Sequence, residues 1–188
     1  MTNSQIHWPS FLHELDATER AWNTRYVRYS RADAVPMLPY PMPQFIALLA
    51  QAVMVAPAGP ARDGRPGPSR FLDAGAGPGA KVRLARAMFG LEAAGFDIVP
   101  EFGLEAASHG ADVFLADAFE FKEYDQYDIV YVNRPSTMMA ELEKHVMSGM
   151  RPGAVLMSVN GRTDPGTEGW PLVTQEWGEP VVGCWIKP

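Results

Sequence analysis

The stretch FLDAGAGPGA (71–80) decides which fold is expected for this sequence. An apolar run leads into Asp73, and Gly75, Gly77 and Gly79 then follow at alternate positions. Glycine tolerates positive φ and lets another group approach the backbone closely. A buried strand that ends in such a run, directly before a helical pattern, predicts a strand–turn–helix unit whose turn holds a ligand against the main chain.

Downstream of this stretch, apolar segments of strand length alternate with segments of helical periodicity. Such alternation is typical of a mostly parallel sheet with helices on both faces. Two short apolar segments near the end, joined by WGEP, predict an antiparallel hairpin at the edge of that sheet. We therefore expect an α/β, three-layer, Rossmann-like fold. The expected strands are 70–74, 94–98, 111–115, 127–132, 154–159, 171–175 and 181–186, and the expected helices are 80–90, 100–108 and about 139–150.

Three segments divide the chain along its length, all within one compact domain. Residues 1–55 carry a helical stripe, then several prolines, then a second helical stripe, and we expect them to form a helical cap on the core. Residues 56–69 are rich in proline and glycine without periodicity, which predicts a flexible connector. Residues 70–188 form the expected ligand-binding core.

The composition excludes several function classes. The 188 residues are 47% hydrophobic and 20% charged, as in ordinary globular domains, and the net charge of -6 argues against duplex nucleic acid as the partner. The arginines at 20, 25, 28 and 31 are interpreted as the solvated face of a helix. No apolar run approaches the ~20 residues of a membrane span, so no membrane partner is expected.

The start of the chain and its cysteine usage indicate a compartment. The N-terminal residues lack a signal-peptide pattern. Cys184 is the sole cysteine, so neither an internal disulfide nor a structural zinc site is expected. The sequence therefore predicts a cytoplasmic protein without a metal, and it leaves the oligomeric state open.

The glycine turn by itself permits two ligands. GAGPGA matches the G-x-G-x-x-G/A pattern of dinucleotide-binding turns, and S-adenosylmethionine binds to similar turns. A carboxylate at Asp73 would repel a pyrophosphate, whereas it would attract the α-ammonium and sulfonium of S-adenosylmethionine. The carboxylate of that cofactor can still take free N–H groups at the start of the helix. The alternative is that Asp73 only caps the turn or the next helix.

Two further acids follow the next two expected strands. Asp97, in GFDIVPE, can accept both hydroxyls of a ribose, a role that either cofactor would use. Asp117, in FLADAFEF, can accept from an adenine amino group while the Ala118 N–H donates to a ring nitrogen. The alternative for Asp117 is an Asx-turn. Three acids at three successive strand ends together favour a nucleoside ligand.

The segments DAGAGPG, GFDIVPE, ADAF, YDIVYVNRP and RPGAVLMS occur in this order, and the sequence resembles the class I S-adenosylmethionine-dependent methyltransferases. The motifs cover roughly residues 70–159, and the terminal hairpin extends the resemblance to the end. It implies a seven-stranded sheet with a reversed last hairpin and S-adenosylmethionine as the cofactor. The residues to which it gives a cofactor-binding role are Asp73, Gly75, Ala76, Gly77, Gly79, Asp97, Ile98, Asp117, Ala118 and Asn133.

The resemblance also indicates where a methyl group would be transferred. Such a transfer needs a positioned nucleophile and a site closed to water, and a general base is optional. The corner VNRP (132–135) would face the methyl group. Asn133 would then orient the substrate, and Arg134 would bind a carboxylate or phosphate of it.

Departures from the motifs of known methyltransferases argue against several classes of substrate. Methyltransferases that act on amino groups of DNA bases or on protein glutamine have Asn/Asp-Pro-Pro-aromatic, whereas here Arg134 and Ser136 break that pattern. The cytosine-C5 class needs a cysteine near this corner, and Cys184 lies elsewhere. Asp128 opens a strand on the far side of the sheet, which argues against a metal-dependent catechol-type site.

Other candidates for the chemistry are more dispersed. The candidate bases are His7, His13, His109 and His145, of which His145 is interpreted as solvated or structural. Tyr26 and Tyr29 lie on the first helical stripe and are expected in the core. The proline-broken stretch 36–43, with Met37, Tyr40 and Met42, is a candidate lid, and the loop 160–170 would supply further substrate contacts.

The leading hypothesis is an S-adenosylmethionine-dependent methyltransferase that acts on a small molecule or on an exposed group of a protein. One alternative is a catalytically silent S-adenosylmethionine-binding module that acts through a partner. Another is a NAD-binding oxidoreductase, which the turn permits and Asp73 disfavours.

Overall fold

The structure, a computed structural model, describes residues 6–29, 40–62, 65–67, 69–133, 139–159, 169–176 and 182–188. Its centre is a seven-stranded sheet. The strands are β3 (Arg70–Ala74), β4 (Glu92–Asp97), β5 (Val113–Leu115), β6 (Ile129–Asn133), β7 (Val155–Val159), β8 (Leu172–Glu176) and β9 (Val182–Ile186). Their order is β5-β4-β3-β6-β7-β9-β8, and β9 runs antiparallel to both of its neighbours. The predicted mostly parallel sheet with a reversed last hairpin is confirmed.

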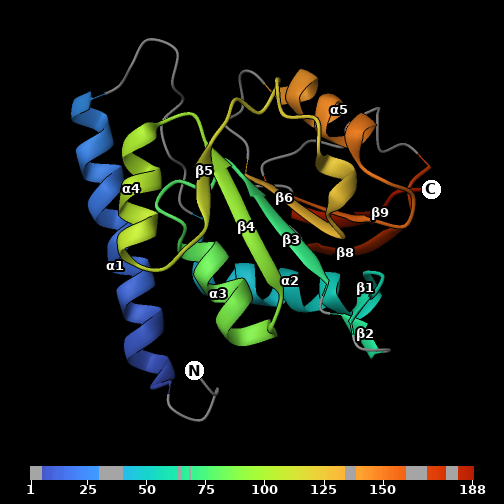
Figure 1. Cartoon of the computed structure of the whole chain (residues 1–188), viewed down its shortest axis with the longest axis horizontal. Helices are drawn as coiled ribbons and strands as arrows, with labels where there is room; N and C mark the ends of the chain where they lie inside the picture. Colours follow the sequence, from blue (N-terminus) through green and yellow to red (C-terminus); the bar gives the residue numbers. More distant parts are fainter. Residues whose placement is uncertain are drawn as a thin grey trace.

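Helices cover both faces of this sheet, which confirms the three-layer prediction (Figure 1). Helices α2 and α3 pack on one face and α5 on the other, while α1 and α4 lie beside each other at the β5 end (Figure 1). The helices are α1 (Trp8–Tyr29), α2 (Met42–Val55), α3 (Ala80–Phe89), α4 (Pro100–Ser108) and α5 (Met139–Gly149), with a 3₁₀ turn η2 at Tyr124–Gln126. None of the helices within the described ranges is long and apolar enough to cross a membrane.

The central strands are apolar because each of their faces is covered. Phe71 points toward α2, where the Phe45 ring packs edge-on against it at 6.2 Å between centroids. Leu72, the next residue, belongs to the opposite core together with Val146 of α5. Burying one such side chain stabilises the fold by about 1.5–3 kcal/mol. The two cores therefore hold β3 and β6 firmly, and the ends of these two strands position the site.

Helix α1 of the N-terminal segment packs against helices α3 and α4. The Trp22 ring of α1 contacts Phe102 of α4 edge-on at 5.1 Å. Tyr40 and Met42 are buried in the core on the α2 face, so this end of the stretch predicted as a lid is core packing. Residues 36–39 of that stretch, with Met37, lie outside the described residues, and so do the side chains of Tyr26 and Tyr29.

The connector differs from its prediction. Instead of an irregular segment, residues 56–69 contain a two-stranded antiparallel ladder of β1 (Gly59–Arg62) and β2 (Arg65–Gly67). Ser69 closes its base by donating from Oγ to the Pro57 carbonyl at 2.9 Å. A ladder of so few residues forms without alternating apolar side chains. The sequence pattern therefore did not predict it.

Candidate functional site

The glycine turn leaves β3 and enters α3 in an unusual backbone conformation. Gly75, Gly77 and Gly79 have φ of +91°, +51° and +78°, all in the left-handed region that favours glycine. The Cβ that an alanine would add at Gly79 would also lie 2.8 Å from the Ala111 Cβ. The sequence-predicted glycines are therefore required by conformation, and Gly79 also by close packing.

The N–H groups of this turn donate to acceptors inside the protein. The bonds run from Gly75 and Ala76 to the Phe96 carbonyl (3.0 and 2.9 Å), from Gly77 to the Asp97 Oδ2 (2.9 Å) and from Gly79 to the Ala76 carbonyl (3.0 Å). Residue 78 is a proline and has no N–H. A turn that cradles a pyrophosphate instead points its N–H groups at the ligand. The N–H groups of residues 75–79 are therefore used within the protein, and an anionic group of a ligand would have to bind at the N–H groups that begin α3.

Asp73 lies beneath the turn and is almost completely buried, with 2% of its surface exposed. Burial raises the pKa of its carboxyl to about 7; the Lys81 ammonium lowers that pKa, and the charges of Glu19 and Asp97 raise it further. At neutral pH the carboxyl is therefore divided between its protonated and ionised forms. A cation that reached this position would favour the ionised form.

A buried ion pair accompanies Asp73. The Lys81 Nζ lies 2.5 Å from the Glu19 Oε1, and both side chains are 7% exposed. Glu19 belongs to α1 and Lys81 to α3, so the N-terminal cap contributes a charge directly beside the turn. The sequence analysis did not single out this pair. The available signal was that Glu19 falls on the stripe of Leu15, four residues earlier, which faces the core.

Asp97 joins the end of β4 to the glycine turn. Its Oδ2 accepts from the Gly77 N–H at 2.9 Å and its Oδ1 from the Val99 N–H at 3.0 Å. Burial raises the pKa of Asp97, and the bonds from backbone N–H groups oppose that rise. A carboxylate has about four acceptor positions, so these backbone bonds leave room for a ligand hydroxyl. Ile98 follows it and is 39% exposed.

Asp117 forms the Asx-turn that was its alternative interpretation. Its Oδ1 accepts from the Phe119 N–H at 2.8 Å. The Ala116 N–H donates to the Asp97 carbonyl at 3.1 Å, which brings the two strand ends together. The Ala118 carbonyl accepts from the Tyr124 hydroxyl at 2.9 Å. The adenine-binding roles of Asp117 and Ala118 stay predictions.

Comparison with solved structures identifies the fold. The RNA methyltransferase from Salinibacter ruber, solved in complex with S-adenosyl-L-homocysteine, superposes with a TM-score of 0.64 at 18% identity, over 80% of this chain and 94% of that one. The chain has the class I methyltransferase fold. The N-methyltransferase NodS from Bradyrhizobium japonicum superposes with a TM-score of 0.54 at 15% identity, over 78% of this chain and 95% of that one. No protein-family model and no curated protein matches the sequence.

In this methyltransferase fold, Asn133 ends β6, the strand beside β3, and its side chain is half-buried. Asn133 and the glycine turn therefore both lie at the carboxyl ends of the parallel strands. Arg134, the other residue expected to position a substrate, lies outside the described residues. Residues 160–168 of the predicted substrate loop lie outside them as well.

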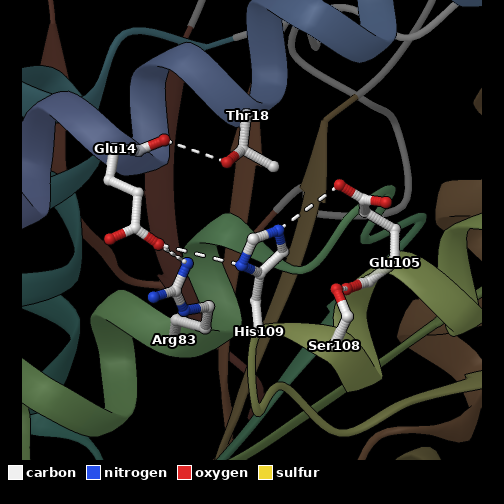
Figure 2. A network of polar contacts seen from close by, with 6 residues as sticks. All are labelled: Glu14, Thr18, Arg83, Glu105, Ser108 and His109. Carbon is white, nitrogen blue, oxygen red and sulfur yellow. Dashed lines mark hydrogen bonds and ion pairs between the residues drawn. The ribbon is translucent and has the colours of Figure 1, made fainter.

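The histidines are engaged away from the turn. His109 lies between the carboxylates of Glu14 and Glu105, with Nδ1 3.8 Å from the former and Nε2 3.3 Å from the latter (Figure 2). Glu14 also pairs with the Arg83 Nη1 at 2.9 Å, so this network ties α1 to α3 and to the end of α4 (Figure 2). The His145 Nε2 lies 3.2 Å from the Phe121 carbonyl.

The two remaining histidines belong to the N-terminal cap. The His7 Nδ1 lies 2.8 Å from the Ser10 Oγ, and His13 is exposed on α1. In the part of the chain that the structure describes, no imidazole is bonded to the turn or to its acids.

One acid, Asp128, lies at the opposite end of the strands of the methyltransferase sheet and has a structural role. Asp128 is buried, accepts from the Arg70 N–H at 2.6 Å and pairs with Arg151. It precedes β6, so it lies at the edge away from the glycine turn, as its sequence position indicated. Within the described ranges, no group of three or more His, Cys, Asp and Glu side chains is arranged to hold a metal ion.

Gly95 of β4 was missed by the sequence analysis. A Cβ there would lie 2.5 Å from the Ala76 Cβ and 3.1 Å from the Asp73 carbonyl oxygen. Glycine at this position lets β4 approach the turn closely enough for the Phe96 carbonyl to accept its N–H groups. A glycine inside a strand is a signal of such close approach.

Substituting Gly95 by alanine should therefore displace the turn. We expect Gly95→Ala to lower the free energy of unfolding by about 1–3 kcal/mol through overpacking and to weaken ligand binding at the turn. Gly103→Ala in α4 is the matched control, because a Cβ there would meet only the Val113 carbonyl oxygen, at an ordinary contact distance of 3.4 Å. Thermal unfolding and calorimetric titration of both variants test this; equal behaviour of the two would contradict it.

Proposed function

We propose that this chain is an S-adenosylmethionine-dependent methyltransferase that transfers a methyl group to a small molecule or to an exposed group of a protein. The observation that carries the proposal is the charge at the turn. Asp73 and Asp97 give it a negative potential, and its own N–H groups are already bonded. A ligand with a cationic amino-acid end and a ribose fits these groups. The pyrophosphate of a dinucleotide does not.

The comparison with the Salinibacter ruber enzyme supports the same ligand, because that protein of the same fold was solved with S-adenosyl-L-homocysteine. When bound, the cofactor supplies a methyl carbon activated by the adjacent sulfonium. The chain's own residues then need only hold the acceptor in line with that carbon and exclude water. We assign the positioning of the acceptor to Asn133 and Arg134, and we place the protein in the cytoplasm.

The test is calorimetric titration of the purified protein with S-adenosylmethionine, S-adenosylhomocysteine and NAD in separate experiments. We expect the first two to bind and NAD to give no heat of binding, because both S-adenosyl compounds carry the α-ammonium that the buried carboxylate attracts. Binding of NAD alone would make the protein a nucleotide-dependent oxidoreductase and would overturn the proposal.

A silent binding module is the second candidate, since none of the histidines in the described ranges is bonded to the turn or to its acids. The two candidates differ in turnover. A methyltransferase releases S-adenosylhomocysteine when it is offered S-adenosylmethionine and a panel of small molecules and peptides. A silent module binds the cofactor with the same affinity and releases none.

A further inference from the structure

One buried hydroxyl near the site is left without a hydrogen bond. Tyr131 of β6 stands directly opposite Asp73 of β3 in the parallel pairing, so both side chains lie on the same face of the sheet. Tyr131 is 1% exposed, and the described part of the chain offers its hydroxyl no hydrogen-bond partner. An unpaired buried hydroxyl is costly and rare in native proteins. Tyrosine in place of phenylalanine at this position therefore needs a reason.

Charges surround this hydroxyl. Burial raises the pKa of Tyr131 well above its usual range, and the nearby Asp73, Glu19 and Tyr40 raise it further. The groups that face Asp73 are Lys81 from α3, Glu19 from α1 and Asp97 from β4. We call Glu19, Asp73, Lys81 and Tyr131 the buried cluster. Its two carboxyls and one ammonium leave one negative charge in excess when both carboxyls are ionised.

We propose that Tyr131 is a positioning residue of the cofactor site, whose hydroxyl donates a hydrogen bond to the ionised Asp73 carboxylate when the cationic amino-acid end of S-adenosylmethionine is bound. The proposal rests on the function proposed above. Without ligand, a proton on Asp73 balances the cluster, and the hydroxyl stays unpaired. The α-ammonium of the ligand replaces that positive charge, the proton leaves to solvent, and the carboxylate gains an acceptor position for Tyr131.

The excess charge determines what the Tyr131 hydroxyl gains when a cationic ligand binds. Lys81 is already paired with Glu19 at 2.5 Å, so it does not by itself hold Asp73 in the ionised form. A protonated carboxyl is a weaker acceptor than a carboxylate, whose hydrogen bonds are about twice as strong. The unpaired hydroxyl therefore destabilises the free protein, and its hydrogen bond to Asp73 forms only in the complex.

The Tyr131→Phe variant tests this through two effects of opposite sign. Removing an unpaired hydroxyl should leave the melting temperature of the free protein equal or higher. The same change should weaken S-adenosylmethionine and S-adenosylhomocysteine about tenfold. Methylthioadenosine, which lacks the amino-acid end, should bind with unchanged affinity. Tyr127→Phe, the same change at the opposite edge of the sheet, should alter none of these affinities.

The pH profile separates positioning from simple packing. In the wild type, S-adenosylmethionine should bind more tightly as pH rises between about 5.5 and 8, because the ionised carboxylate is the binding form. In Tyr131→Phe this gain should be smaller. Unchanged affinity and pH profile in Tyr131→Phe, or an equal loss for methylthioadenosine, would overturn the inference alone. Failure of the wild type to bind either S-adenosyl compound would overturn the proposed function and this inference with it.

Discussion

The Lys81→Met variant is expected to lose about 3–5 kcal/mol of its free energy of unfolding, because it removes one partner of a buried ion pair. Lys81 is the cation that faces both Glu19 and Asp73, and all three side chains are buried. Methionine keeps the length and apolar packing of the stem, so the loss reports the charge. Denaturant unfolding near pH 7.5 measures it, and the deficit should shrink at acid pH, where the Asp73 carboxyl takes up a proton.

Glu19→Gln is the matched control for that prediction. It removes the other partner of the same pair, yet Lys81 retains the Asp73 carboxylate as a counter-charge. We therefore expect a much smaller loss than in Lys81→Met. Because Glu19 raises the pKa of Asp73, the control should also lower the pH at which that carboxyl ionises. Equal losses in the two variants would show that the lysine acts as one half of an isolated pair, independent of Asp73.

The Asp73→Asn variant is expected to gain stability and lose its ligand. Burial raises the pKa of Asp73 from 3.8 to about 7. Between these values the folded state holds a proton that the unfolded state has released, so wild-type stability falls as pH rises. The amide carries no such penalty. The unliganded variant should therefore be more stable than the wild type at pH 8, by on the order of 4 kcal/mol, and the difference should vanish as the pH falls to about 4.

The same variant should bind S-adenosylmethionine about 100-fold more weakly, since the ammonium loses its counter-charge in a buried site. Asp128→Asn is the control, because it changes another buried carboxylate, which pairs with Arg151 at the far edge of the sheet. It should lower stability and leave the affinity intact. Unchanged S-adenosylmethionine binding in Asp73→Asn would contradict the assigned geometry of the site.

The sheet and the turn could be predicted from the sequence because their signals are local. The apolar segments at 70–74 and 154–159 are strands covered on both faces, and such strands consist almost entirely of apolar residues. The glycines at 75, 77 and 79 have positive φ, a conformation that glycine tolerates wherever it occurs. Where signals were weaker, strand boundaries moved by up to two residues: β4 begins at Glu92 and β5 at Val113.

The buried cluster could not be predicted in the same way. Whether a charged side chain is buried depends on what packs against it, and Glu19 and Lys81 are 62 positions apart in the chain. Tyr131 read as one more apolar residue of a covered strand, since a sequence does not show whether a hydroxyl finds a partner. Asp117 illustrates the converse, because its local Asx-turn was foreseeable and its ligand role depends on distant groups.

The last strand of the sheet has a consequence for how the protein folds. β9 lies between β7 and β8 although it follows both in the chain, and it is the sheet neighbour of β8. Until β9 is in place, β7 is an open edge of the sheet and β8 has no strand to pair with. An uncovered apolar edge is where unwanted pairing with other chains begins. A folding intermediate in which Val182–Ile186 has not yet paired with β7 is thus the form in which this edge is open to other chains.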